Sequence, residues 1–257
     1  MADLEPGVPT TPVVVEVADE KPIIAAPKTA PRSAPKWETD ARDRVRVAIR
    51  RFSKPLADLV ARDANEGDTR LLVTDLLCDA LGYDKYEDLT TEYQVKGEFA
   101  DYGIRLDKQL VAFIECKRSA TKLGAKHLRQ VQQYAVNEGV EWVWLTNGAV
   151  WQVYHIEGVL PLVVDLALQV DLLNDPPAQA AQGLFYISKV ALRRKLIDNL
   201  WQEKRAKSPK SLARALLSEP VAEAIRKELR RSTSQNIAPS EISRLLRETV
   251  VRPDCLS

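Results

Sequence analysis

The sequence predicts an α/β fold, with a mixed central sheet flanked by helices and followed by an all-helical C-terminal region. Two changes in hydrophobic period lead to this prediction. Apolar residues recur at three- and four-residue spacing up to Leu81, alternate at a spacing of two between Glu92 and Lys117, and return to helical spacing beyond Lys122. After a break at residues 174–177, which are rich in turn formers, only helical patterns follow.

The N-terminal segment differs in composition from the rest of the chain. Residues 1–37 hold seven of the fifteen prolines and show neither a helical nor an alternating period. Such a segment buries too little apolar surface to offset its ordering entropy. We therefore expect residues 1–37 to form a disordered Pro-rich tail and a folded domain to begin at Glu38.

Three helical segments are expected before the sheet. A first helix begins near Glu38, and Pro55 is expected to open or kink a second, short one. A third helix is expected to have Asp68 or Thr69 as its N-cap and Gly82 as its left-handed C-terminal residue.

The strands are predicted from alternating residues and from turn signals between them. Asn147-Gly148 is the strongest two-residue hairpin signal in the chain, so the strands on either side of it should pair. The predicted strands are 92–95, 99–106, 110–117, 142–146 and 150–156, with a helix at 122–138. The helices expected after the break are 186–204, 210–218, 220–231 and 239–250, the last with Ser240 as its N-cap.

Composition and charge narrow the class of protein. No apolar stretch reaches the roughly 18–20 residues of a membrane span, and the opening MADLEPG lacks the basic and apolar runs of an export signal, so a cytoplasmic protein is expected. The three cysteines are too few and too far apart for a disulfide framework. The net charge is only +1, yet residues 189–231 hold 13 Lys or Arg against 5 acidic residues, a local surplus suited to DNA or a partner.

One strand end carries charges that need a partner. Glu115 and Lys117 face the same way at the end of the apolar run VAFIECK, and isolated charge in such a place is costly. Asp101 lies on the preceding strand, and the turn between them returns the chain antiparallel, so that Asp101 can sit beside Glu115. Two carboxylates suit magnesium, and Lys117 can orient a water and offset developing negative charge. This combination is what phosphodiester hydrolysis requires.

Asp101 with Glu115-Cys116-Lys117 resembles the D…ExK signature of PD-(D/E)xK nucleases, which have a restriction-endonuclease-like core. Over roughly residues 60–156 the chain is most similar to the N-terminal nuclease domain of type I restriction enzyme R (cleavage) subunits. The similarity includes Asn-Glu-Gly-Asp-Thr-Arg at 65–70 and Gln130-Val-Gln-Gln-Tyr134, which fits the QxxxY element of that family. Ala100 stands where the superfamily name has proline, and the sequence has no GxxxxGK[ST] phosphate loop, so DNA translocation is not expected to be intrinsic.

The resemblance implies a role for each of these residues. It implies a metal-dependent nuclease domain over residues 38–172 that cleaves DNA with Mg²⁺ or Mn²⁺, with RNA as the alternative substrate. The implied catalytic residues are Asp101, Glu115, Lys117, Gln130, Tyr134 and Glu66, and the candidate metal-binding positions are Asp101, Glu115 and Cys116. A role in prokaryotic or phage-related defence or DNA processing follows.

The remaining expectations concern partners and alternatives. The helical region 180–257 is expected to bind DNA or to oligomerise, and a separate motor or specificity subunit is an expected partner. The alternative function is a catalytically silent DNA-binding or scaffold subunit, in which Glu115 forms only a strand-end salt bridge with Lys117 or Arg118. On that reading Glu66 is a solvated first-turn acid, Gln130 and Tyr134 are ordinary helix positions, and the Cys116 side chain is a small buried hydrophobe.

Overall fold

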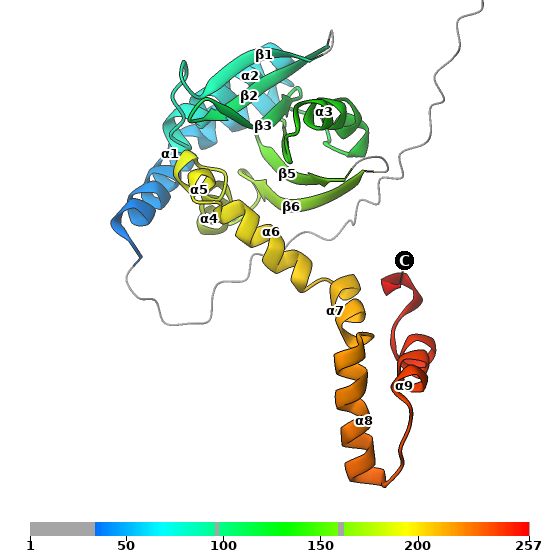
Figure 1. Ribbon diagram of the computed structural model, residues 1–257. Coiled ribbons are helices and arrows are strands. Elements are labelled where there is room, and N and C mark those ends of the chain that lie inside the picture. Colours follow the sequence, from blue (N-terminus) through cyan, green and yellow to red (C-terminus); the bar gives the residue numbers. More distant parts are fainter. Residues whose placement is uncertain (1–33, 96–97, 159–161, 257) are drawn as a thin grey trace, which may run out of the picture. The chain divides into compact units, whose positions relative to one another are not determined.

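The computed structural model describes residues 34–95, 98–158 and 162–256 (Figure 1). Most of the predicted tail, residues 1–33, lies outside the described residues. The chain divides into two compact units, Met1–Ile197 and Asp198–Ser257, and each is considered by itself. The first unit contains the whole sheet, so it confirms the predicted α/β fold.

The sheet of the first unit has six strands in sequential order, β1-β2-β3-β4-β5-β6. All neighbouring pairs are antiparallel except β3 and β4, which are parallel. A parallel pair needs a crossover, and helix α3 (Ala125–Glu138) provides it. The sheet is therefore mixed, as predicted. Its strands are β1 (Leu89–Val95), β2 (Glu98–Leu106), β3 (Gln109–Cys116), β4 (Trp142–Thr146), β5 (Val150–Glu157) and β6 (Val163–Asp171).

Strand β6 was not among the predicted strands. Its sequence, VVDLALQVD, lies in an apolar stretch without strict alternation, which does not distinguish a strand from a buried helix. Pairing with β5 over eight residues, from Val150↔Asp171 to Glu157↔Val163, makes it a strand. This is tertiary information that the local sequence does not contain.

The first helix of the unit contains a proline in its interior. Helix α1 (Lys36–Ala61) continues through Pro55, which corrects the prediction of a separate second helix. Its buried face carries Phe52, Leu56 and Leu59 on both sides of the proline, so packing outweighs the lost hydrogen bond. The C-terminal residue Gly82 of the next helical segment has φ +77, as predicted.

The cap of the third predicted helix is also corrected. Helix α2 (Glu66–Asp75) begins after Asn65, whose side chain accepts a hydrogen bond from the backbone N–H of Asp68 at 2.8 Å. Asn65 rather than Asp68 or Thr69 is the N-cap, so the first turn starts earlier and contains Glu66. A π-helical turn η1 (Leu76–Ala80) completes this helix.

The core of the first unit on the α3 side is a continuous apolar cluster between that helix and the strands. It consists of Ala100, Phe113, Leu128, Val131, Tyr134, Ala135, Val140, Val143, Leu145, Tyr154 and Ile156.

Helices α1 and α2 and the short helices α4 (Pro177–Phe185) and α5 (Lys189–Arg193) also belong to this unit. Helix α4 was not predicted, and it packs against α1 and β6. Helices α2 and α3 both contact β3, the strand that carries Glu115 and precedes Lys117.

The second unit is helical, as predicted for the C-terminal region. Helix α7 (Pro209–Leu216) packs on α8 (Glu219–Thr233), and α8 packs on α9 (Pro239–Leu245). The N-cap of α9 is Ala238, not Ser240, because Pro239 takes the first helical position. The remaining elements are α6 (Leu196–Ala206), which spans the unit boundary, η2 (Leu246–Val250) and η3 (Pro253–Cys255). Among the helices that the structure describes, none has the length and apolar character needed to cross a bilayer.

The β4–β5 turn gives the first testable prediction. Gly148 has φ +85, and a Cβ atom added there would lie 3.3 Å from Leu56 Cδ1 and 3.4 Å from Thr69 Cγ2. Gly148→Ala is therefore expected to lower the free energy of unfolding by about 1–2 kcal/mol through backbone strain and crowding. Urea denaturation measures the change. Gly124→Ala is the control, since nothing lies within 4 Å of its added Cβ; equal losses in both variants would contradict the prediction.

Candidate active site

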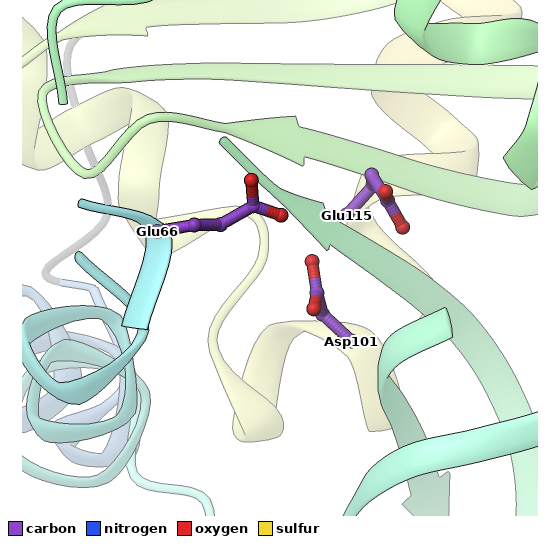
Figure 2. A group of neighbouring side chains, drawn as sticks. All are labelled: Glu66, Asp101 and Glu115. Carbon is purple, nitrogen blue, oxygen red and sulfur yellow. The ribbon is translucent and has the colours of Figure 1, made fainter. Parts of the chain in front are cut away.

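Three carboxylates from three different elements converge at one end of the sheet (Figure 2). The ligand oxygens of Glu66, Asp101 and Glu115 all lie within 4.8 Å of one another. The β2–β3 register pairs Tyr102 with Ile114, and extending it by one pair places Asp101 opposite Glu115. The antiparallel return between these two residues is therefore the one predicted from their spacing.

Glu66 enters the group from the first residue of α2. The Asn65 cap fixes where that helix begins, and the loop before it is anchored to the end of β3. The Ser119 backbone N–H donates to Ala64 O at 3.3 Å, and its hydroxyl donates to Leu59 O at 3.0 Å. A loop held at both ends delivers Glu66 to the strand end, although its side chain is still 47% exposed.

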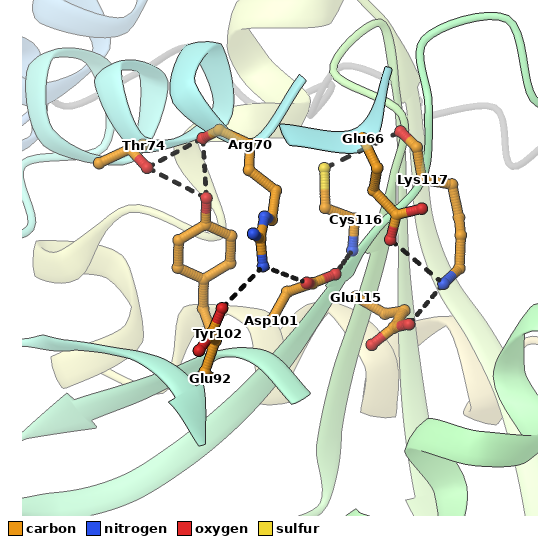
Figure 3. A network of polar contacts seen from close by, with 9 residues as sticks. All are labelled: Glu66, Arg70, Thr74, Glu92, Asp101, Tyr102, Glu115, Cys116 and Lys117. Atoms are coloured by element: carbon orange, nitrogen blue, oxygen red, sulfur yellow. Dashed lines mark hydrogen bonds and ion pairs between the residues drawn. The ribbon is translucent and has the colours of Figure 1, made fainter. Parts of the chain in front are cut away.

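Lys117 supplies the cation of the group. Its Nζ lies 2.5 Å from Glu115 Oε1 and 3.7 Å from Glu66 Oε1 (Figure 3). The residue follows the last residue of β3, and its backbone N–H donates to Thr146 O at 2.7 Å, which continues the pairing with β4. Glu115 and Lys117 thus face the same way, as the two-residue period of a strand predicts.

Asp101 is held by one hydrogen bond and one ion pair. Its Oδ2 accepts a hydrogen bond from the Cys116 backbone N–H at 2.7 Å. Its Oδ1 lies 3.0 Å from Arg70 Nη1. Only 13% of the side chain is exposed, so this carboxylate is fixed in orientation at the edge of the group.

Glu115 is the most buried acid of the three, with 6% of its side chain exposed. Burial raises its pKa to about 7, against the lowering effect of the Lys117 hydrogen bond, and Asp101 and Glu66 add to the rise. Its Oε2 atom is buried and has no hydrogen-bond partner among the described residues. A buried carboxylate oxygen without a donor is costly unless another cation satisfies it.

These residues fit a hard divalent cation. Magnesium and manganese prefer oxygen ligands, and magnesium is commonly bound through one or two carboxylates plus water. The unpartnered Glu115 Oε2 and the nearby oxygens of Asp101 and Glu66 offer that donor set. The buried oxygen is the observation that distinguishes this group from an ordinary surface cluster of acids.

The other predicted site residues are Gln130, Tyr134 and Cys116. The side chain of Gln130 lies outside the described residues. Tyr134 is 2% exposed within the α3 core cluster, where its ring meets Phe113 edge-on at 6.3 Å, and its role at the site stays a prediction. Cys116 is fully buried, and burial raises the pKa of its thiol well above the ordinary value. A protonated thiol is a poor magnesium ligand, so we leave this side chain out of the metal site.

Arg70 and Glu92 lie beside Asp101, although neither was predicted from the sequence as a site residue. Arg70 pairs with Asp101 and also lies 3.8 Å from Glu92 Oε1. The signals for Arg70 are its place in the 65–70 segment that carries the family resemblance and its position four residues after Glu66, which puts both on one face of α2. Nothing in the sequence singles out Glu92, which lies on β1 opposite Asp101 in the β1–β2 register.

A mixed sheet flanked by helices, with three carboxylates and a lysine gathered at a strand end, defines an α/β protein with an acidic cluster that could bind a metal ion. Residues 65–159 match the family model described as "Type I restriction enzyme R protein N terminus (HSDR_N)". The match contains Glu66, Asp101, Glu115 and Lys117, and it confirms the resemblance inferred from the sequence motifs. No curated protein and no solved structure matches the chain significantly.

Proposed function

We propose that this protein is a metal-dependent nuclease of the PD-(D/E)xK type that hydrolyses phosphodiester bonds of DNA. The observation that carries the proposal is the grouping of Glu66, Asp101 and Glu115 with Lys117, in which Glu115 Oε2 is buried without a donor among the described residues. The match of residues 65–159 to the N terminus of type I restriction enzyme R proteins supports a restriction-related role.

Each residue of the proposed site has a distinct task. When bound, Mg²⁺ or Mn²⁺ polarises a phosphate oxygen and lowers the pKa of a water. Asp101 and Glu115 would hold the cation, and the partly exposed Glu66 would assist them. The Lys117 ammonium lies between Glu115 and Glu66, where it can orient the attacking water and offset charge on the phosphate. Gln130 and Tyr134 stay in the proposal on the QxxxY resemblance alone.

We also propose how DNA reaches the site and which partners take part. The basic surplus at 189–231 is partly neutralised by acids outside that range, since Lys189 pairs with Asp88 and Arg193 with Asp107. The positive charge that remains is modest, so this chain alone is expected to bind duplex DNA weakly. A partner, such as a motor or specificity subunit, would then help to bring the DNA to the site. We place the protein in the cytoplasm, in prokaryotic or phage-related defence or DNA processing, with residues 180–257 serving DNA binding or oligomerisation.

The test is cleavage by the purified full-length chain. Supercoiled plasmid, linear duplex, single-stranded DNA and RNA are each incubated with Mg²⁺, Mn²⁺ or EDTA, together with Asp101→Asn as the site variant. Wild-type protein is expected to cut DNA only when a divalent cation is present. Asp101→Asn is expected to cut about a hundredfold more slowly, because the cation loses one anionic ligand.

The outcomes separate the alternatives. Cleavage of RNA but not DNA would keep the site and change the substrate. Cleavage that Asp101→Asn retains in full would locate the activity elsewhere. If the folded wild type binds DNA and cuts no substrate with either cation, the nuclease proposal fails in favour of a silent DNA-binding or scaffold subunit.

A further inference from the structure

Arg70 is fixed to the strand that carries Asp101. Its backbone carbonyl accepts hydrogen bonds from the Tyr102 hydroxyl at 2.7 Å and from Thr74 Oγ1 at 2.9 Å (Figure 3). Tyr102 is adjacent to Asp101 on β2 and is almost fully buried. The base of the Arg70 side chain therefore has a defined position, while the side chain itself keeps 36% of its surface exposed.

The Arg70 guanidinium has two carboxylates within reach. Its Nη1 lies 3.0 Å from Asp101 Oδ1 and 3.8 Å from Glu92 Oε1. Glu92 has φ +51 and is left out of the β1–β2 pairing, which passes from Thr91↔Tyr102 directly to Tyr93↔Ala100. A non-glycine residue in this left-handed conformation is uncommon. The register is the same on both sides of Glu92, so this acid lies on β1 opposite Asp101 on β2.

The two oxygens of Asp101 are both engaged. Oδ2 accepts from the Cys116 N–H, a bond that belongs to the strand end, and Oδ1 faces Arg70. A cation bound at Asp101 must share an oxygen with one of these donors. The cation and the Arg70 guanidinium are both positive, so they repel each other strongly when both contact the same carboxylate at low dielectric. The Arg70 contact is the weaker constraint, because its side chain is partly exposed and a second acceptor stands beside it.

We propose that Arg70 is a positioning residue that occupies Asp101 in the cation-free protein and transfers to Glu92 when a divalent cation binds. The inference rests on the metal site of the proposed function. In the cation-free state Arg70 neutralises Asp101, which would otherwise lie beside Glu115 and Glu66 with only Lys117 to offset three acids. Glu92 provides the acceptor that makes the release of Asp101 less costly.

The test is calorimetric titration of Mn²⁺ into the full-length chain without DNA. Arg70→Met is expected to bind Mn²⁺ about tenfold more tightly than wild type, because the competing cation is gone. Glu92→Gln is expected to bind about threefold more weakly in the wild-type background and nearly unchanged in the Arg70→Met background. The control is Arg62→Met, which removes an arginine that pairs with Asp68 at 3.2 Å in the loop region near α2.

The outcomes distinguish this inference from the metal site itself. Equal Mn²⁺ affinities of wild type, Arg70→Met and Arg62→Met would overturn the role of Arg70 and leave the metal site intact. A Glu92→Gln effect of the same size in both backgrounds would overturn the transfer. If neither wild type nor Arg70→Met binds Mn²⁺, the metal site fails and the proposed function fails with it. Should Arg70→Met not fold, Arg70→Lys, which keeps the charge but loses the planar fork, is expected to bind two- to threefold more tightly, as an estimate.

Discussion

Replacing Lys117 with alanine is expected to lower the rate of DNA cleavage by about a hundredfold to ten-thousandfold, the range observed when a positioned proton-transfer or charge-stabilising group is removed. The Lys117 ammonium is held 2.5 Å from Glu115 Oε1 and 3.7 Å from Glu66 Oε1, so it points into the carboxylate group. Burial lowers the pKa of Lys117, but the hydrogen bond to Glu115 and the nearby acids outweigh this effect, so the pKa is raised overall and the ammonium form is favoured. A side chain that serves only as a strand-end ion pair would not affect cleavage by this factor.

The measurement is the initial rate of plasmid nicking together with Mn²⁺ affinity. Lys117→Ala is expected to retain or increase Mn²⁺ affinity, because a cation has been removed from the site, while cleavage collapses. Lys122→Ala is the matched control, since Lys122 is exposed and lies in the same loop after β3. A Lys117→Ala protein that nicks DNA within threefold of wild type would remove Lys117 from the catalytic set.

The fold and half of the site were predictable because their signals are local. Alternation in β2 and β3, together with the positive-φ turn at Asp107 and Lys108, fixes an antiparallel return that puts Asp101 beside Glu115. Lys117 follows from the same two-residue period. These predictions need no knowledge of how distant segments pack.

The parts that the sequence did not predict depend on contacts between distant segments. Strand β6 exists because β5 pairs with it, and Pro55 stays helical because α1 is packed on both sides of it. Arg70 reaches Asp101 across 31 residues of chain, and Glu92 joins them because the β1–β2 pairing places it opposite Asp101. No local propensity or motif encodes such positions. The burial that raises the pKa of Glu115 is also a property of the assembled fold.

Glu115 should make both stability and cation binding depend on pH near neutrality. Its pKa of about 7 in the folded chain lies above the ordinary value of 4.5, chiefly because the carboxyl is desolvated. Between these two values the folded state holds a proton that the unfolded state has released. The free energy of unfolding must therefore fall as the pH rises from about 4.5 to about 7, by roughly 3 kcal/mol if only this group titrates.

Urea denaturation in EDTA at pH 5 and pH 8 measures this loss, and Glu115→Gln is the reference because its amide does not titrate. Between the two pH values wild type is expected to lose about 2.5 kcal/mol more than Glu115→Gln. The comparison cancels every other titrating group that the two proteins share. Equal losses would mean that Glu115 is already ionised at pH 5, and the argument from a buried, unsatisfied oxygen would lose its basis.

The same proton controls the proposed metal site. A cation binds the carboxylate and not the carboxylic acid, so Mn²⁺ affinity is expected to fall by about tenfold for each pH unit below 7 and to level off above it. Binding at pH 6 should release close to one proton, which calorimetry in buffers of different ionisation enthalpy detects. Glu115→Gln is expected to bind Mn²⁺ at least a hundredfold more weakly, as an estimate, with no such pH dependence. Without a cation, the free energy of unfolding falls as the pH rises, because the ionised Glu115 is buried. A cation binds most tightly at that same high pH. Its binding energy therefore offsets the cost of burying the charge and reverses the trend.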